Sequence, residues 1–222
     1  GVTGTKGKTT VSTLAGGLLR EALPDTRVGG NMGVTALGQL ADVSPHAPFV
    51  LEISSWQLEA LIEHRLAPRV AVLTLIAEDH LNTYDGFEDY AATKRGITWH
   101  QQSGDYLVVN QDDPESWRAA GETNAAIAPF GLNDSGADGA WQSGEDLVWR
   151  WQGHEARWPA PQSPGLRGPH GRRNALAAIA AAMLAGSNAG AVQRGLDGFT
   201  GVRDRMEVVG TIAGVTYIND TT

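Results

Sequence analysis

Apolar positions in the first half of the chain follow two different spacings. Val11, Leu14 and Leu18 recur at about 3.6 residues per turn, which predicts one buried face of a helix. Residues 49–53 and 70–76 are instead short, nearly continuous apolar runs. Such runs are typical of strands in a parallel sheet that is covered on both faces. The chain therefore begins as a mixture of helices and buried strands.

The same patterns predict further elements up to residue 110. We expect a strand at Val28, a helical stretch over 34–40, a helix over 87–97 and a strand over 106–109. We expect no strand before the glycine-rich segment at the start of the chain. Alternation of strands and helices predicts an α/β fold, with a doubly wound, mostly parallel sheet.

Residues 121–168 have a different character. Five of the seven tryptophans lie between Trp117 and Trp158, among glycine, proline and short polar residues. Residues 147–151 and 154–158 flank Gln152 and Gly153, which predicts a β-hairpin. We expect an antiparallel β insertion over 121–168. Its tryptophans could stack on carbohydrate, but we favour packing of a small sheet because tryptophan is first a large hydrophobe.

The last third of the chain contains one more helix and one more hairpin. Residues 174–184 are almost pure alanine and predict a closely packed helix. Residues 206–212 and 215–218 flank Ala213 and Gly214 and predict a second hairpin.

Composition narrows the class of protein. The 222 residues carry a net charge of −8 and include no cysteine. Nucleic-acid and membrane-surface partners are disfavoured because both select clustered positive charge. The longest apolar stretch, residues 70–77, is too short to cross a bilayer. We predict a cytoplasmic protein. We also expect an internal part of a longer protein, because the chain opens inside a loop at Gly1 and stops at Thr222.

The glycine-rich segment over residues 1–10, GVTGTKGKTT, resembles a phosphate-binding loop. Backbone N–H groups of such a loop surround phosphate oxygens, and the following helix adds its positive end. Lys8 would contact the β- and γ-phosphates and Thr9 would bind Mg²⁺. The strict phosphate-loop pattern, G-x-x-x-x-G-K-S/T, is not met, because Val2 stands where its first glycine is expected. The alternative to a phosphate loop is a glycine-rich turn before an ordinary helix. The predicted phosphate contacts are Gly4, Thr5, Lys6, Gly7, Lys8, Thr9 and Thr10.

Other polar residues follow predicted strands and turns. Glu52 ends a strand, where a carboxylate could bind Mg²⁺ or equally interact with a helix N-terminus. His80 could cap a strand end, and Lys94 could be a solvated charge on an exposed helix. Asn31 lies in a glycine turn, where it could contact substrate or only tolerate positive φ. Spacing alone leaves these alternatives open.

Several segments together resemble the Mur ligases and folylpolyglutamate synthetases, which are ATP-dependent amide-bond-forming enzymes. They follow the loop in the family's order: 29–33 (GGNMG), 51–59 (LEISSWQLE), 78–80 (EDH), 90–94 (YAATK), 170–178 (HGRRNALAA), 199–207 (FTGVRDRME) and 218–220 (IND). The 51–59 segment and the Gly-Gly-Asn turn are most similar to the D-glutamate-adding Mur ligases. The resemblance covers nearly the whole chain.

The resemblance implies a central ATP-binding domain over residues 1–222, without the N-terminal UDP-binding and C-terminal domains. It implies ATP, two Mg²⁺ ions and a carbamylated lysine at Lys94. Lys8, Glu52, His80 and Lys94 would be catalytic, and Thr9, Glu52, His80 and carbamylated Lys94 would bind metal. Asn174 would contact adenine, Arg205 phosphate and Asp220 ribose, whereas Asn31 and Ser54 would face the substrate. Each of these five residues also has a structural alternative. Asn174 and Ser54 could be helix caps, Arg205 a surface charge, and Asp220 and Asn31 turn residues.

The implied reaction joins D-glutamate to UDP-N-acetylmuramoyl-L-alanine through an acyl phosphate, a step in peptidoglycan precursor synthesis. The alternatives are another Mur ligase, a folylpolyglutamate synthetase or, in a different class, a nucleotide-binding regulatory ATPase. Leu75, Gly171 and Thr222 depart from the family's pattern, where asparagine, asparagine and lysine are common.

Overall fold

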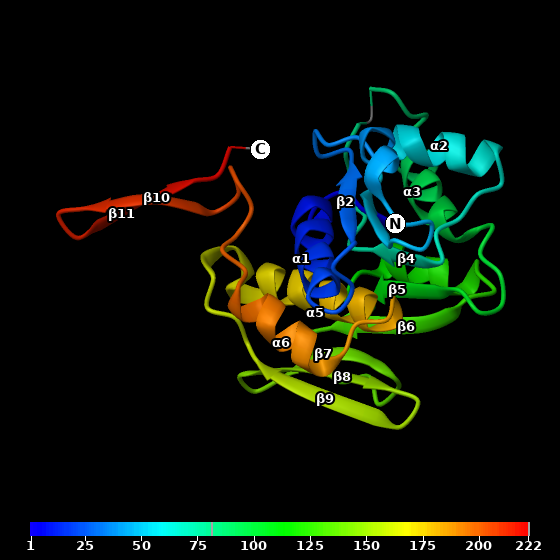
Figure 1. Cartoon of the computed structure of the whole chain (residues 1–222). Helices are drawn as coiled ribbons and strands as arrows, with labels where there is room; N and C mark the ends of the chain where they lie inside the picture. The colour runs from blue at the N-terminus through cyan, green and yellow to red at the C-terminus, as the bar shows by residue number, and fades with distance from the viewer. Residues whose placement is uncertain (81, 222) are drawn as a thin grey trace.

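A nine-stranded sheet organises the chain in the computed structural model, which describes residues 1–80 and 82–221 (Figure 1). Its strand order is β2-β3-β1-β4-β5-β6-β7-β8-β9. Six strands belong to its first part: β1 (Val2–Thr3), β2 (Arg27–Gly30), β3 (Phe49–Glu52), β4 (Val70–Leu73), β5 (Tyr106–Asn110) and β6 (Ala126–Gly131). All six are parallel, as the sequence predicted.

Helices cover both faces of this sheet. On one face lie α1 (Lys8–Arg20), α5 (Gly168–Leu184) and α6 (Ala189–Asp197), and on the other lie α2 (Ser55–Glu63) and α3 (Phe87–Arg95). The alternation of side chains along the strands divides the core accordingly. Val72 and Val108 pack with α1 and α5, whereas Leu73 and Leu107 pack with α2 and α3. This is the doubly wound arrangement expected from the near-continuous apolar runs.

Two strand predictions need correction. The chain does have a strand before the glycine loop, since Val2 and Thr3 pair with both β3 and β4. Two residues are too few to show a periodic signal. The apolar run over 70–76 is strand only to Leu73, because the backbone from Leu75 onward instead contacts the loop at Thr5 and the Asp113 carboxylate.

The helical stretch predicted over 34–40 is a short 3₁₀ segment, Leu37–Asp42. The helix predicted over 87–97 ends at Arg95 and continues as a 3₁₀ turn, Gly96–Thr98. Between β5 and β6 lie the short helix α4 (Pro114–Trp117) and a 3₁₀ turn, Arg118–Gly121.

Antiparallel pairing involves a smaller part of residues 121–168 than the sequence predicted. The strand β6 continues the parallel sheet, and β7 (Gly139–Ser143) is parallel to it. Antiparallel pairing joins β7 to β8 (Asp146–Trp151) and β8 to β9 (His154–Pro159), at the edge of the same sheet. Trp149 and Trp158 are buried in the main core, as packing residues should be.

The second predicted hairpin is confirmed as β10 (Glu207–Ile212) and β11 (Val215–Asn219). Ala213 and Gly214 both have positive φ, which suits the twist of a two-residue hairpin. This hairpin forms a separate two-stranded sheet that projects from the body (Figure 1). Among the described residues, none of the helices combines the length and hydropathy needed to span a bilayer.

Candidate nucleotide and metal site

The predicted site residues gather where the order of strands changes direction. The chain moves from β1 to β2 on one side, returns to β3 next to β1, and then crosses to β4 on the other side. Ligands of open α/β sheets bind at such a switch point, outside the carboxyl ends of the strands. The glycine loop follows β1, Glu52 ends β3, and His80 lies in the segment after β4.

The glycine loop is fixed to the segment that follows β4. The Thr5 backbone N–H donates to the Leu75 carbonyl (2.7 Å), and the Thr74 hydroxyl donates to the Lys6 carbonyl (2.6 Å). Gly4 has a φ of 138°, and a Cβ there would lie 2.0 Å from Thr74 Oγ1. Only glycine permits both this conformation and this approach. The segment after β4 therefore fixes the conformation of the loop.

Lys8 stands at the first turn of α1 and folds back over the loop. Its ammonium donates to the carbonyls of Gly4 (3.0 Å) and Thr5 (3.1 Å). Burial lowers the pKa of Lys8, Glu52 opposes that shift, and Arg205 adds to it. Glu52 and Arg205 are thus both close enough to act electrostatically on Lys8. Thr9 and Thr10 occupy the same first turn, whereas Lys6 is exposed.

Glu52 is a buried carboxylate with one unused oxygen. Its Oε1 accepts a long hydrogen bond from Asn31 Nδ2 (3.4 Å), and Oε2 finds no hydrogen-bond partner among the described residues. The Asn31 backbone N–H also donates to the Glu52 carbonyl (2.9 Å). Glu52 is 3% exposed, and leaving a charged oxygen unpaired at such a depth is costly. The arrangement suits a carboxylate that binds a cation.

Lys94, in the last turn of α3, lies beneath the loop rather than in solvent. Its side chain is 2% exposed, and Nζ donates to Thr3 Oγ1 (3.3 Å). Burial, followed by the nearby charge of Lys8, lowers the pKa of Lys94 to about 7, although Asp79 and Glu52 act in the opposite direction. A large fraction of this amine is therefore neutral and nucleophilic near neutral pH.

His80 is held between two aromatic rings. Its ring centroid lies 5.0 Å from that of Trp56 and 6.0 Å from that of Tyr90. The backbone of His80 has a φ of 52°, unusual for a residue other than glycine, and its N–H donates to Asp79 Oδ1 (2.9 Å). Strain at a polar residue next to a phosphate loop is a pointer to function.

Tyr90 and Thr3 are residues of this site that sequence reasoning did not single out. The Tyr90 hydroxyl lies 3.2 Å from Thr5 Oγ1, and the Tyr90 ring faces the ammonium of Lys94 at 5.4 Å. Tyr90 could have been found from the sequence, because it lies one helical turn before Lys94 and therefore on the same face of the helix. Thr3 gave none, because it lies in a strand of two residues.

Ser54 caps the helix that carries Trp56. Its hydroxyl accepts from the Gln57 N–H (3.2 Å), while Gln57 Oε1 accepts from the Ser54 N–H (2.9 Å). This reciprocal pair is a capping box and orients α2 directly after Glu52. The cap accounts for Ser54 structurally, and a contact with substrate stays a prediction.

A second group of predicted residues lines one cavity beside the loop. The cavity measures about 300 Å³, and Gly7, Thr10, Asn174, Arg205 and Asp220 contribute to its wall. At Gly7, with a φ of 91°, a Cβ would lie 2.6 Å from Asn174 Oδ1. Asp220 Oδ1 accepts from the Met206 N–H (3.2 Å). Residues of α1, α5 and the C-terminal hairpin region therefore meet here, whereas Thr222 lies outside the described residues.

The donor set fits Mg²⁺ bound together with a nucleotide. Within residues 1–80 and 82–221, no group of three or more His, Cys, Asp or Glu side chains forms a cage for a metal ion. Mg²⁺ usually takes only one or two protein carboxylates and completes its shell with phosphate and water. Glu52, with its unpaired oxygen, meets that requirement, and Thr9 and His80 are further candidates.

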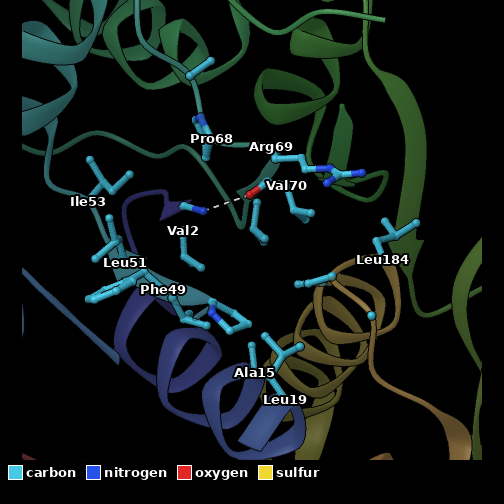
Figure 2. A pocket seen from close by; sticks show the side chains of 18 of the residues that line it. Val2, Ala15, Leu19, Phe49, Leu51, Ile53, Pro68, Arg69, Val70 and Leu184 are labelled. Carbon is cyan, nitrogen blue, oxygen red and sulfur yellow. Dashed lines mark hydrogen bonds between the residues drawn. The ribbon is translucent and has the colours of Figure 1, made fainter. Parts of the chain in front are cut away.

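A larger cavity than the one beside the loop lies elsewhere in the described part of the chain. It measures about 650 Å³ and lies at the amino-terminal ends of β3 and β4, lined mainly by apolar side chains (Figure 2). None of the predicted catalytic residues lines it. For phosphate chemistry we favour the smaller cavity because charged and glycine residues converge there.

Comparison with known sequences identifies related proteins. A family model described as "Mur ligase middle domain" matches residues 2–182. UDP-N-acetylmuramoylalanine–D-glutamate ligase of Roseiflexus sp. (strain RS-1) is 40% identical over 230 residues, covering 100% of this chain and 49% of the relative. The ligase of the same name from Geotalea daltonii is 37% identical over 219 residues, covering 99% and 48%. The chain thus spans about half the length of the curated relatives it matches.

Solved structures share the fold at lower identity. The crystal structure I of MurF from Acinetobacter baumannii has a TM-score of 0.75 and 20% identity, covering 99% of this chain and 49% of that one. E. coli FolC in complex with DHPP and ADP has a TM-score of 0.68 and 19% identity, covering 100% and 61%. These matches support the doubly wound fold.

Proposed function

The chain belongs to the Mur ligase family, and on that premise we propose that residues 1–222 are the ATP-binding middle domain of a D-glutamate-adding ligase. Two relatives that share about two-fifths of its residues carry that activity in their names. Because the chain matches about half of each relative, the proposal concerns the whole protein to which this domain contributes. UDP-N-acetylmuramoyl-L-alanine and D-glutamate would be its substrates.

One observation carries the chemical part of this proposal. Glu52, Lys8 and Lys94 are all at least partly buried and act electrostatically on one another at the carboxyl ends of the central strands. A simple nucleotide switch needs the loop and its lysine but has no use for a second buried lysine beside a carboxylate. A ligase has to assemble two negatively charged reactants, ATP and a carboxylate, which this set of charges supports.

ATP would bind across the loop and the adjoining cavity. Backbone N–H groups of Gly4 to Thr10 and the positive end of α1 would hold the phosphates. Lys8 would leave the carbonyls of Gly4 and Thr5 and reach the β- and γ-phosphates. Asn174 would then lie toward the adenine, Arg205 toward the phosphates and Asp220 toward the ribose, since all three line that cavity.

The reaction would proceed in two steps. An oxygen of the substrate carboxylate attacks the γ-phosphorus of ATP, and the bond to the β-phosphate oxygen breaks, giving an acyl phosphate and ADP. The neutral amine of D-glutamate then attacks the acyl carbon, phosphate leaves, and the nitrogen loses a proton. Lys8 would neutralise charge on the transferred group, and Asn31 would orient the carboxylate from its turn beside Glu52.

Glu52, Thr9 and His80 would hold Mg²⁺, with Lys94 contributing as a carbamate. When bound, the metal neutralises charge on the phosphates and on the acceptor carboxylate. Lys94 would form its carbamate as the neutral amine adds to the carbon of CO₂ and releases one proton. That reaction turns a buried cation next to Lys8 into an anion, which removes a repulsion and provides a further ligand.

The remaining substrate contacts would come from UDP-binding and C-terminal domains, and we place the whole enzyme in the cytoplasm. The 222-residue chain alone would bind ATP without completing a turnover.

The test is phosphate release by the intact protein with ATP, Mg²⁺ and UDP-N-acetylmuramoyl-L-alanine, with single amino acids added in turn. Release that requires both D-glutamate and the UDP-sugar supports the proposal. If release required another amino acid or a folate instead, the protein would still be a ligase, but the substrates proposed here would be wrong. Phosphate release without any acceptor would favour the regulatory ATPase.

A further inference from the structure

Arg95, the residue that follows Lys94, is the centre of an ion-pair cluster. Its guanidinium nitrogens each donate to a different carboxylate: Nη2 to Glu88 Oε1 (2.7 Å), Nη1 to Glu115 Oε2 (3.0 Å) and Nε to Glu122 Oε1 (2.9 Å). The Arg95 side chain is only 4% exposed. Because a guanidinium group is planar and its donors point in fixed directions, the three carboxylates together define its position closely.

The three carboxylates come from separate parts of the chain. Glu88 belongs to the first turn of α3, Glu115 to α4, and Glu122 follows the 3₁₀ turn after α4. Arg118 bridges Glu88 (2.9 Å) and Glu115 (3.3 Å). The indole N–H of Trp99 donates to Glu122 Oε2 (2.9 Å). The cluster therefore ties both ends of α3 to the connection between β5 and β6.

Helix α3 presents this cluster and its contacts with the phosphate loop on different faces. Tyr90 and Lys94 are about one turn apart and therefore share one face, whereas Glu88 and Arg95 are about two turns apart and share another. The first face contacts the loop and β1 through the Tyr90 hydroxyl and the Lys94 amine. A rotation of the helix that broke the contacts on the second face would displace both groups from the first.

Other interactions fix the orientation of α3 less closely. The helix has nine residues, and Gly86 at its N-cap supplies no side-chain hydrogen bond. Helices this short are not stable alone in water, so tertiary contacts must hold α3 in place. Buried Tyr90 and Ala91 pack in the apolar core, but hydrophobic contact has no preferred direction. Buried ion pairs add little net stability because desolvation offsets their attraction, so orientation is the main effect we expect from the cluster.

We propose that Arg95 is a positioning residue for the ligation reaction. Its contacts with the three carboxylates hold the end of α3 in the orientation that places the Lys94 amine beside Thr3, beneath the phosphate loop. There the amine can form its carbamate and reach the metal held by Glu52. This inference rests on the proposed function, because Arg95 acts only through Lys94.

A double-mutant cycle in the intact protein tests this role. Arg95→Met keeps most of the side-chain length and removes all of the carboxylate contacts, and we expect it to lower the kcat of ligation about 10-fold. If Arg95 acts through Lys94, the same substitution should cause no further loss in a Lys94→Ala background. The ¹³C NMR signal of the Lys94 carbamate should also weaken in Arg95→Met. Arg157→Met, which breaks an exposed ion pair in the edge strand β9, is the control and should stay within about two-fold of wild type.

A second variant covers the case in which Arg95→Met melts below the assay temperature. Arg95→Lys then takes its place in the same cycle. It keeps the positive charge, but a single ammonium group lacks the planar fork that contacts three carboxylates. We expect a smaller loss of about three-fold in kcat, again absent in the Lys94→Ala background.

The results that would overturn the inference differ from those that would overturn the proposed function. If Arg95→Met ligates at the wild-type rate, or lowers ligation by the same factor with and without Lys94, Arg95 does not position the lysine and the proposed function stands. If Lys94→Ala itself ligates as well as wild type, the proposed role of Lys94 fails, and the role of Arg95 fails with it.

Discussion

The Lys94 ammonium and the Thr3 hydroxyl lie 3.3 Å apart, although 91 positions separate them in the chain. Thr3 Oγ1 itself donates to the Ile53 carbonyl (2.8 Å), which leaves it free to accept from the lysine. This contact anchors the end of α3 beneath the phosphate loop. It places the lysine where the charges of Lys8 and Glu52 act on it.

Replacing Lys94 tests whether a carbamate is required. We expect Lys94→Ala to reduce ligation by the intact enzyme about 100-fold, because a metal ligand and a buried anion are lost. Bicarbonate or excess chloride should partly restore activity by supplying an anion. The matched variant Lys94→Arg, which keeps the cation, should be inactive and unaffected by either. If Lys94→Ala folds normally but neither anion restores any activity, the carbamate role is wrong.

The pKa of Lys94 predicts a pH dependence of carbamate formation. Only the neutral amine reacts with CO₂, and this lysine becomes neutral as pH rises through about 7. At a fixed concentration of dissolved CO₂, the carbamate signal in ¹³C NMR should increase between pH 6 and 8 in wild type and be absent in Lys94→Arg. A signal that develops only near the ordinary lysine pKa would contradict the burial-driven shift.

Glu52→Gln keeps the shape of the side chain and removes its charge. We expect Mg²⁺-dependent ligation to fall about 100-fold or more, since the unpaired Oε2 would no longer bind a cation. The melting temperature should stay close to wild type, because no strong hydrogen bond is lost. Activity curves against Mg²⁺ measure this effect, and Glu145→Gln, at a distant turn, is the control. Wild-type activity in Glu52→Gln would exclude it as a metal ligand.

Alanine substitutions at two glycines of one turn distinguish the cost of a positive φ from the cost of a steric clash. Gly30 and Gly33 both have positive φ, but a Cβ at Gly30 would lie 2.1 Å from the Glu52 carbonyl, whereas Gly33 faces open space. Gly33→Ala should lower the melting temperature by roughly 2–4 °C, and Gly30→Ala by clearly more and with lost activity. Equal effects in thermal denaturation would mean that the contact with Glu52 is unimportant.

Local patterns predicted most of the elements. Helix α1, the strand β5 and both hairpins have regular spacing or clear turn residues, so their positions could be inferred before the fold was known. The strand β1 could not, because it has two residues and depends on its neighbours for pairing. The end of β4 also depends on long-range contacts, since the Ile76 N–H donates to Asp113 Oδ2.

The site was predictable only in part. The glycine loop could be recognised from its own residues, because glycine, lysine and threonine are adjacent there. The burial of Lys94 and the close approach of Asn174 to Gly7 depend on how distant elements pack, so spacing did not indicate them. The resemblance to a family supplied only the roles expected of these two residues. The capping role of Ser54 was predicted directly from its position before α2.

The most direct test of the proposed ligation follows an oxygen atom. The intact enzyme is supplied with ATP, Mg²⁺, D-glutamate and UDP-N-acetylmuramoyl-L-alanine labelled with ¹⁸O in the alanyl carboxylate, and the released phosphate is analysed by mass spectrometry. An acyl phosphate predicts one ¹⁸O atom in each phosphate, transferred from the carboxylate. Unlabelled phosphate would show that water attacks ATP, and would contradict the assignment of this domain to a ligase reaction.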